Sequence, residues 1–358
     1  MGLHQLTLRD FRLFAELTFN PDPQAVTVLL SPNGTGKTSV LEAVYALATA
    51  SSFRTTSAGD MIRVGASLAE VHGVLFQRER RVQVDLTLTR GTRTTKRMLV
   101  NGQRPRSRAD VAEALPLTVF TPEGVDVVRH GPEHRRTFLT NLMTDVDPST
   151  GEVVERFHRV LSQRNALLRG LDGAWPTPEQ RDELEVWSSD LAAVSAELVG
   201  HRRALVGDLA PRVADRYHRL AETTQVVGLT YEQSWSGDLV DALTQSLGDD
   251  RFRGHTTVGP HRDDLAVTLD GRDARRQASQ GEQRSLALAL RLAGHGLVQD
   301  RRAVDPLLLL DDVFSELDPE RARRLLTLLP AGQTLVTTAS PLPAGMNPAA
   351  VVDLSEVA

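Results

Sequence analysis

Alternating and continuous apolar stretches predict a strand-rich first third of the chain. Short alternating segments predict strands at 3–8 and 15–19, and the apolar run 25–30 predicts a third strand. Alternation returns in a meander of antiparallel strands at 69–76, 81–89 and 96–100, with turns at Gly91 and Asn101-Gly102. Because this is not a plain alternation of strands and helices, we predict an α/β core that carries an additional antiparallel β layer.

The pattern becomes helical in the middle of the chain. From Pro132 to about Gly248, apolar residues recur every three or four places, most clearly within 179–223. We predict a helical insertion here, too short and too interrupted to form a long coiled-coil arm. Two strand-like segments, 226–231 and 265–269, are then expected to return the chain to the main sheet. The predicted division is one lobe of residues 1–130 and 256–358, with a helical lobe of residues 131–255 inserted.

A phosphate-binding motif follows the apolar run 25–30. The sequence Ser31-Pro32-Asn33-Gly34-Thr35-Gly36-Lys37-Thr38 fits G-x-x-x-x-G-K-[ST], except that Ser31 stands at the first place. A strand, a glycine turn and a helix over 39–49 would present free N–H groups and a positive dipole end to an anion. Glycines let backbone amides close on a triphosphate, the lysine supplies charge, and the threonine hydroxyl can ligate Mg²⁺. Residues 31–38 are therefore predicted to bind a nucleotide.

A second apolar run, 307–310, ends in Asp311 and Asp312. A buried parallel strand would deliver these acids to the edge of the sheet opposite the phosphate loop. Asp311 would hold Mg²⁺ through water, and Asp312 would orient or deprotonate the attacking water. The predicted catalytic residues are Lys37, Asp311 and Asp312, and the predicted metal ligands are Thr38 and Asp311.

Composition limits the remaining possibilities. The chain has 358 residues, 41% hydrophobic residues and no cysteine, which excludes a disulfide framework and a thiolate metal site. Its net charge of −5 means that any nucleic acid must bind to a local basic patch. No apolar run approaches the length of a membrane-spanning helix, and the N-terminus does not begin like a signal peptide. We expect a soluble, cytoplasmic protein that makes no contact with a membrane.

Two further motifs complete a family pattern. The segment S-x-G-E-Q over 279–283 enters a predicted helix at 286–298, and S-E-L-D-P over 315–319 follows the acid pair. This order of motifs resembles the ABC-type ATPases, in particular their DNA-repair branch related to the SMC proteins. Within that branch, residues 52–55, 135–139 and 256–265 are similar to the RecF family of bacterial recombination mediators. The resemblance spans essentially the whole chain.

The chain departs from the common ATPase pattern at three places. Against the signature L-S-G-G-Q it has Ala278, Gln280 and Glu282, while Ser279 and Gly281 are kept as predicted nucleotide contacts. Aspartate stands at 312 where transporter ATPases place a catalytic glutamate, which predicts slow hydrolysis. Residues 337–340 (Thr-Thr-Ala-Ser) replace a phosphate-sensing histidine, and a hydroxyl there could still reach the phosphate. No glutamine lid is evident, since Thr121-Pro122-Glu123 occupies its expected position.

The resemblance implies a mechanism. In this family the signature of one subunit caps the nucleotide held by another, so ATP would bridge two copies head to tail. The homodimer would clamp duplex DNA at gaps or single/double-strand junctions and help to load recombinase, with RecR- and RecO-type mediator proteins as partners. A weak, DNA-stimulated ATPase would reset the clamp. The alternatives are the ATPase subunit of an ABC transporter, an SMC-like chromosome-organising ATPase and a small-molecule P-loop kinase.

Several basic residues have two interpretations. His261 lacks a second nearby histidine, so a structural or communication role is favoured over metal binding. Arg129, His130, Arg135 and Arg136 could form a phosphate patch near DNA or simply a solvated helix end. The cluster at 201–203 is more consistent with a solvated face than with a contact site.

Overall fold

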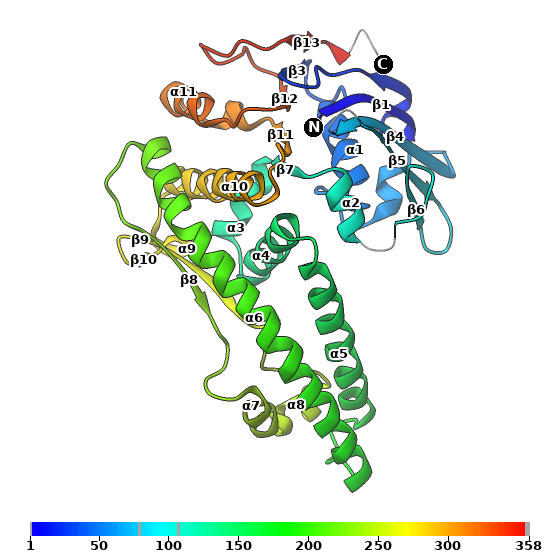
Figure 1. Cartoon of the computed structure of the whole chain (residues 1–358), viewed down its shortest axis with the longest axis vertical. Helices are drawn as coiled ribbons and strands as arrows, with labels where there is room; N and C mark the ends of the chain where they lie inside the picture. Colours follow the sequence, from blue (N-terminus) through cyan, green and yellow to red (C-terminus); the bar gives the residue numbers. More distant parts are fainter. Residues whose placement is uncertain (1, 78–79, 106–107, 355–358) are drawn as a thin grey trace. The chain divides into compact units, whose positions relative to one another are not determined.

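The computed structural model describes residues 2–77, 80–105 and 108–354, which divide into two compact units (Figure 1). Unit 1 contains residues 1–125, 216–223 and 287–358, and unit 2 contains residues 126–215 and 224–286. No helix in the described part of the chain is long and apolar enough to cross a bilayer.

Unit 1 contains an antiparallel sheet with the strand order β2-β1-β4-β5-β6. All of its pairings are antiparallel, as the alternating segments predicted. The turn after β6 has positive φ at both Asn101 and Gly102, 51° and 77°, which is the geometry that Asn-Gly favours. The strands are β1 (Gly2–Phe11), β2 (Phe14–Phe19), β4 (Leu68–Gln77), β5 (Arg80–Thr89) and β6 (Thr95–Val100).

A second sheet of unit 1, in the order β13-β3-β12-β11-β7, is parallel in all its pairings. The parallel and the antiparallel pairings of unit 1 therefore belong to two separate sheets. Strand β11 is buried along its whole length, with Leu307 and Leu309 in one core and Leu308 and Leu310 in the other. The strands are β3 (Val26–Leu30), β7 (Leu117–Phe120), β11 (Leu307–Asp311), β12 (Thr334–Thr338) and β13 (Ala350–Val352).

The helices of unit 1 fill the spaces around these sheets. Helix α1 packs in the core shared by the antiparallel sheet and one face of the parallel sheet, while α10 and α11 supply residues to the core on its other face. The helical segments are α1 (Lys37–Thr49), η1 (Ala58–Met61), α2 (Arg108–Ala114), η2 (Pro122–Val125), η3 (Val313–Glu316), α11 (Pro319–Leu328), and the later parts of α6 (Pro178–Ala221) and α10 (Gln280–Arg302).

Unit 2 is mainly helical. Helix α5 packs along the first part of α6, where Arg156 pairs with Glu197 and Arg164 Nε donates to Ser188 Oγ at 3.1 Å. Helix α6 contains Pro211 and is the longest helix of the described chain, in agreement with the helical spacing of 179–223. The other helices are α3 (Asp126–Arg129), α4 (Pro132–Val146), α5 (Thr150–Gly170), α7 (Leu239–Gln245), α8 (Leu247–Arg253) and α9 (Ala274–Gln277).

The two late strands do not rejoin a main sheet, so that prediction was wrong. Strands β8 (Val227–Glu232) and β9 (Asp264–Leu269) pair antiparallel and form a separate sheet with β10 (Arg272–Asp273). Periodicity shows that a segment can form a strand but not which strand pairs with it. Here β8 pairs with β9, the next strand along the chain. As a result residues 256–286 belong to unit 2, whereas the predicted ATPase lobe included them.

Candidate functional site

The phosphate loop connects β3 to α1 and depends on its two glycines. Gly34 and Gly36 have φ of 88° and 99°, a region that residues with side chains rarely adopt. A Cβ on Gly36 would also lie 2.6 Å from Cζ of Phe14, so packing and backbone conformation both require glycine there. The loop leads into the first turn of α1, whose N–H groups have no partner within the helix and are available to an anion.

Lys37 is buried beneath this loop. Its Nζ donates to the carbonyl oxygens of Ser31 and Pro32, at 2.5 and 2.8 Å. Burial lowers the pKa of Lys37, and the negative charges of Asp312 and then Asp311 oppose that shift. The ammonium therefore lies within the electrostatic field of Asp311 and Asp312. Its two acceptors are neutral carbonyls, which an anionic phosphate can replace with a stronger, charge-assisted bond.

Asp311 is bonded to both neighbouring elements of unit 1. Its Oδ1 accepts from Thr38 Oγ1 at 2.9 Å and from Thr337 Oγ1 at 2.6 Å. Hydroxyl and carboxylate oxygens are the ligands that Mg²⁺ prefers, and two adjacent ligands of an octahedral Mg²⁺ lie roughly 3.0 Å apart. The Thr38–Asp311 separation therefore fits a magnesium site. Thr337, in the segment that replaces the phosphate-sensing histidine, donates to this acid.

Asp312 adopts a left-handed backbone conformation at the end of β11, with φ of 48°. Its N–H lies 3.1 Å from Thr337 O and 3.0 Å from Thr337 Oγ1, which fixes the turn. Its Oδ1 is buried and finds no hydrogen-bond partner among the described residues. Burying a carboxylate oxygen without a hydrogen-bond donor costs free energy. Such an atom in a native structure calls for an explanation, and a bound molecule that donates to it is one.

The signature segment lies in unit 2 and forms the start of α10. Ser279 N donates to Glu282 Oε2 at 2.7 Å, and Glu282 N donates to Ser279 Oγ at 3.3 Å, which is a capping box. Hydrogen bonds from Gln225 and then from Ser279 lower the pKa of Glu282. The departure at 282 thus has a structural role, because glutamate closes the first turn of the helix. Ser279 is exposed at this helix start and Gly281 is half-buried.

Comparisons with known proteins agree with this set of motifs. A family model described as the RecF/RecN/SMC N-terminal domain matches residues 2–341. The DNA replication and repair protein RecF of Frankia alni is 39% identical, over 95% of this chain and 93% of that protein. The RecF of Acidothermus cellulolyticus is 35% identical, over 95% of this chain and 94% of its own length. The chain belongs to the RecF family.

A solved structure supports the fold. It is described as the recombination mediator protein RecF with ATP in the RecFOR pathway, and it matches this chain with a TM-score of 0.88 at 24% identity. The match covers 98% of this chain and 94% of the other. The predicted fold class, an ABC-ATPase head with an antiparallel β layer and a smaller helical lobe, is confirmed. Membership of the RecF family also removes the transporter subunit as an alternative.

Ser31, the departure from the common loop motif, binds the C-terminal segment. Its Oγ donates to Asp353 Oδ1 at 2.7 Å and accepts from Leu354 N at 2.8 Å. Leu354 is fully buried. Glycine at position 31 would lose both bonds, so the serine fastens the end of the described chain to the phosphate loop. No signal in the sequence connects residues this far apart.

The RecF-like segment 52–55 forms a turn attached to the phosphate-loop helix. Ser52 Oγ accepts from the N–H groups of Arg54 and Thr55 and donates to Glu42, a fully buried residue of α1. Glu42 also receives two bonds from Arg12, at 2.5 and 2.7 Å. An acid at 42 lies on the otherwise apolar side of a helix, which is the one sequence signal that could have identified this cluster.

The RecF-like segments 135–139 and 256–265 meet within unit 2. Arg135 is buried and donates to both carboxylate oxygens of Asp264 at 2.7 Å, while Arg136 donates to the carbonyl of Asp263. Arg135 is therefore neither part of a free phosphate patch nor part of a solvated helix end, whereas Arg136 is half-buried. His261 is also structural, as favoured: its Nε2 lies 2.9 Å from Thr256 O, and burial lowers the pKa of His261 to about 4.

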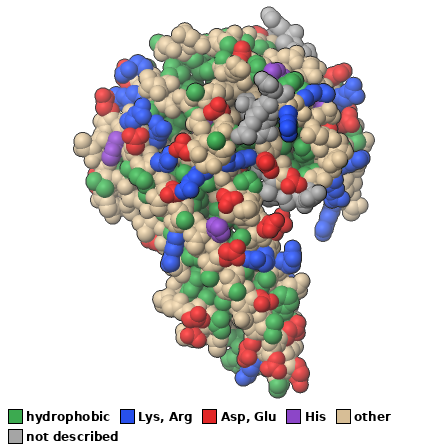
Figure 2. Space-filling view, viewed as in Figure 1, with side chains coloured by type: hydrophobic (Ala, Val, Ile, Leu, Met, Phe, Trp, Pro, Cys, Tyr) green, Lys and Arg blue, Asp and Glu red, His purple; other side chains and the backbone are tan. Residues whose placement is uncertain are grey.

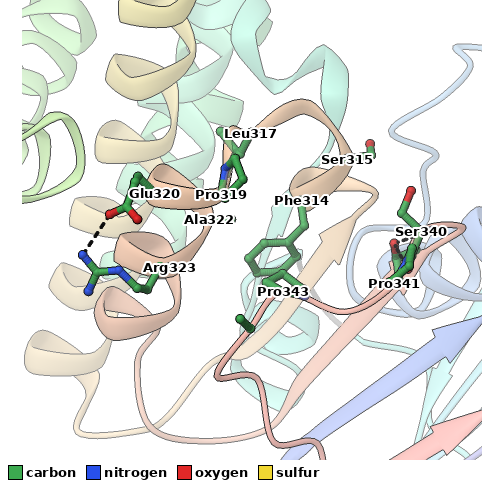
Figure 3. A pocket seen from close by; sticks show the side chains of 12 residues that line it. Phe314, Ser315, Leu317, Pro319, Glu320, Ala322, Arg323, Ser340, Pro341 and Pro343 are labelled. Atoms are coloured by element: carbon green, nitrogen blue, oxygen red, sulfur yellow. Dashed lines mark hydrogen bonds and ion pairs between the residues drawn. The ribbon is translucent and has the colours of Figure 1, made fainter.

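A cavity of about 370 Å³ lies beside the segments that follow Asp312 and Thr338 (Figure 3). Phe314 and Pro343 are among the residues that line it, and Glu320 and Arg323, which also line it, form an ion pair of 3.0 Å. Its walls come from S-E-L-D-P, from the first half of α11, from the end of β12 and from the loop that follows. The expected position of a glutamine lid, 121–123, follows β7 and includes the first two residues of η2.

Proposed function

We propose that this chain is an ATP-dependent DNA-binding protein of recombinational repair. The observation that carries the proposal is the bonded set of Thr38, Asp311 and Thr337 beside the phosphate loop, next to the partnerless buried oxygen of Asp312. Membership of the RecF family, whose curated relatives are DNA replication and repair proteins, supports the role in repair. The solved relative described with ATP supports the choice of nucleotide.

Each residue of the site has a distinct role in the proposed hydrolysis. The backbone of residues 31–36 and Lys37 hold the phosphates, and Thr38 and Asp311 are the residues that would hold Mg²⁺. That ion supplies charge stabilisation at the phosphates. Asp312 orients the attacking water and accepts its proton through Oδ1. Aspartate is one methylene shorter than glutamate, which is consistent with slow turnover.

ATP is proposed to act by joining two copies head to tail. Ser279 and Gly281 of one copy would contact the nucleotide held by Lys37 of the other, because the start of α10 presents N–H groups suited to an anion. The γ-phosphate then favours the homodimer by mass action, since it binds that state preferentially. Hydrolysis returns the protein to monomers.

The proposed ligand of the dimer is duplex DNA at gaps or single/double-strand junctions. Basic and acidic side chains are interspersed on the face in Figure 2, and the chain carries a net charge of −5, so DNA must be held by local arginines. RecR- and RecO-type proteins are the proposed partners, since the solved relative is described as part of the RecFOR pathway. Together they would promote loading of recombinase onto single strands.

A steady-state ATPase assay with and without DNA tests this function. We expect a slow basal rate that rises several-fold with gapped duplex and less with single strands. Asp312→Asn should lower both rates by roughly 10²–10⁴-fold, which excludes a contaminating ATPase. A rate that duplex DNA leaves unchanged, together with no ATP-dependent retention of DNA, would contradict the proposal.

A further inference from the structure

Two histidines and one aspartate of unit 2 converge at the junction of α3 and α4. Asp126, His130 and His134 each offer one ligand atom, and these atoms all lie within 4.8 Å of one another. Within the part of the chain that the structure describes, this is the one group of three potential metal-binding side chains with such spacing. None of the three has a role in the nucleotide site.

The backbone explains why these residues meet. His130 N donates to Asp126 O at 2.9 Å, and His134 N donates to Gly131 O at 3.2 Å, so two successive turns place the side chains on one side. Gly131, extended at φ −71° and ψ 176°, separates α3 from α4. The imidazole rings of His130 and His134 lie edge to face, with centroids 5.0 Å apart.

The separations fit a shared ion better than a hydrogen bond. His130 Nε2 and Asp126 Oδ1 are 3.6 Å apart, beyond hydrogen-bonding distance. Two ligand atoms bound at about 2.0–2.1 Å to one tetrahedral Zn²⁺ lie roughly 3.4 Å apart. A shift of a few tenths of an ångström at this pair, with rotation of the His134 ring, would bring three ligands to one ion.

The exposure of the two histidines and the chemistry of imidazole also favour a zinc site. Both histidines are exposed, so they contribute little to packing, and their side chains can rotate without disturbing the core. Imidazole nitrogen suits zinc and its neighbours, whereas magnesium prefers oxygen, so this site differs in kind from that of Thr38 and Asp311.

We propose that Asp126, His130 and His134 bind Zn²⁺, with solvent completing the coordination. The ion would connect α3 to α4 across Gly131 and Pro132. Arg129 in the same turn has its Nε 3.5 Å from Oε1 of Gln283, which lies in the first turn of α10 after Ser279. The metal would therefore hold the segment that contacts the signature helix.

Zinc titration of the full-length, tag-free protein tests the proposal. The protein is stripped with a chelator and kept in excess Mg²⁺, so that the carboxylates near the phosphate loop are occupied. Competition with a chromophoric chelator should show one equivalent of tightly bound Zn²⁺. Removal of even second-shell partners costs roughly 10–100-fold in metal affinity, so His130→Asn, His134→Asn and Asp126→Asn should each weaken binding at least tenfold.

His72→Gln is the matched control. His72 also contacts a carboxylate, Asp85, but the structure places no second imidazole beside that pair among the described metal-binding groups. The Zn²⁺ affinity of the His72→Gln protein should equal that of the parent. Co²⁺ substituted for Zn²⁺ in the parent should give a visible absorption band that the His134→Asn protein lacks. Circular dichroism without metal confirms that each variant is folded. Absence of tight binding in the parent, or affinity within twofold in the His130 and His134 variants, would overturn the proposal.

Discussion

At the scale of single residues, the charges of Lys37, Asp311 and Asp312 depend on one another. Desolvation lowers the pKa of Lys37, and the negative charges of Asp312 and Asp311 oppose that shift by favouring the charged ammonium. Lys37 also interacts electrostatically with Asp312, whose buried Oδ1 has no hydrogen-bond donor among the described residues. We therefore expect a substitution at Lys37 to affect mainly ATP binding, and a substitution at Asp312 to affect mainly ATP hydrolysis.

Lys37→Ala should weaken ATP binding by roughly tenfold to a hundredfold, because it removes a charge-assisted contact to phosphate. Lys37→Arg keeps the charge and should retain more binding, but it misplaces the γ-phosphate and lowers hydrolysis. Lys96→Ala is the control, since Lys96 is the other lysine of the chain and donates to Ala50 O on the surface. Titration with a fluorescent ATP analogue measures all three, and unchanged affinity in Lys37→Ala would place the nucleotide elsewhere.

Asp312→Asn keeps the shape of the side chain and removes the base. ATP should still bind and join two copies, while hydrolysis falls by roughly 10²–10⁴-fold, the usual contribution of general-base catalysis. Glu320→Gln is a control, because it neutralises an exposed acid in the nearby helix α11. Phosphate release under single-turnover conditions provides the rate. Hydrolysis by Asp312→Asn at the parental rate would mean that another carboxylate is the base.

At the scale of elements, a buried ion pair connects helices α5 and α8. Arg164 and Asp250 are 1% and 0% exposed and 2.8 Å apart, and Thr256 and Ser188 accept further bonds from the arginine. Thr257 bonds to the other carboxylate oxygen of Asp250. The RecF-like segment 256–265 is thus the site where several elements of unit 2 are bonded together.

Arg164→Met should destabilise unit 2 by about 3–5 kcal/mol, because it leaves Asp250 buried and unpaired. Arg156→Met is the matched control on the same helix: its pair with Glu197 is exposed, so the cost should be about 0–1 kcal/mol. All three tryptophans, at 175, 187 and 235, lie in unit 2, so fluorescence during urea unfolding reports on this unit. Asp250→Asn added to Arg164→Met should recover part of the loss. Equal costs for the two arginine variants would contradict this account.

At the scale of the whole molecule, the proposed dimer requires that the signature act on a second copy. Ser279→Arg should leave ATP binding to the monomer intact and block ATP-dependent dimerisation, because a bulky cation would collide with the phosphate loop of the other copy. Sedimentation velocity with ATP measures the association. Loss of the N-cap alone costs typically about 1 kcal/mol, so Ser279→Ala controls for the helix end and should still dimerise.

Mixing Ser279→Arg with Lys37→Ala makes this prediction sharper. A twofold pair of these variants contains one site with both defects and one site with neither, so some heterodimer and some ATPase should return. Normal dimerisation of Ser279→Arg alone, or loss of its monomeric ATP affinity, would show that the signature acts within its own chain.

The sequence by itself predicted most of the strands and helices and the residue types of the proposed site. Short-range patterns indicate whether a segment is a strand or a helix. The backbone freedom of Gly34 and Gly36 and the charges of Lys37 and Asp311 follow from their residue types, so they can be read from the sequence. The pairing of β8 with β9 and the assignment of 256–286 to unit 2 were decided only by tertiary structure, because periodicity does not identify a partner. The same holds for the bond of Ser31 to Asp353, since it joins residues that are far apart in the sequence and that only folding brings together.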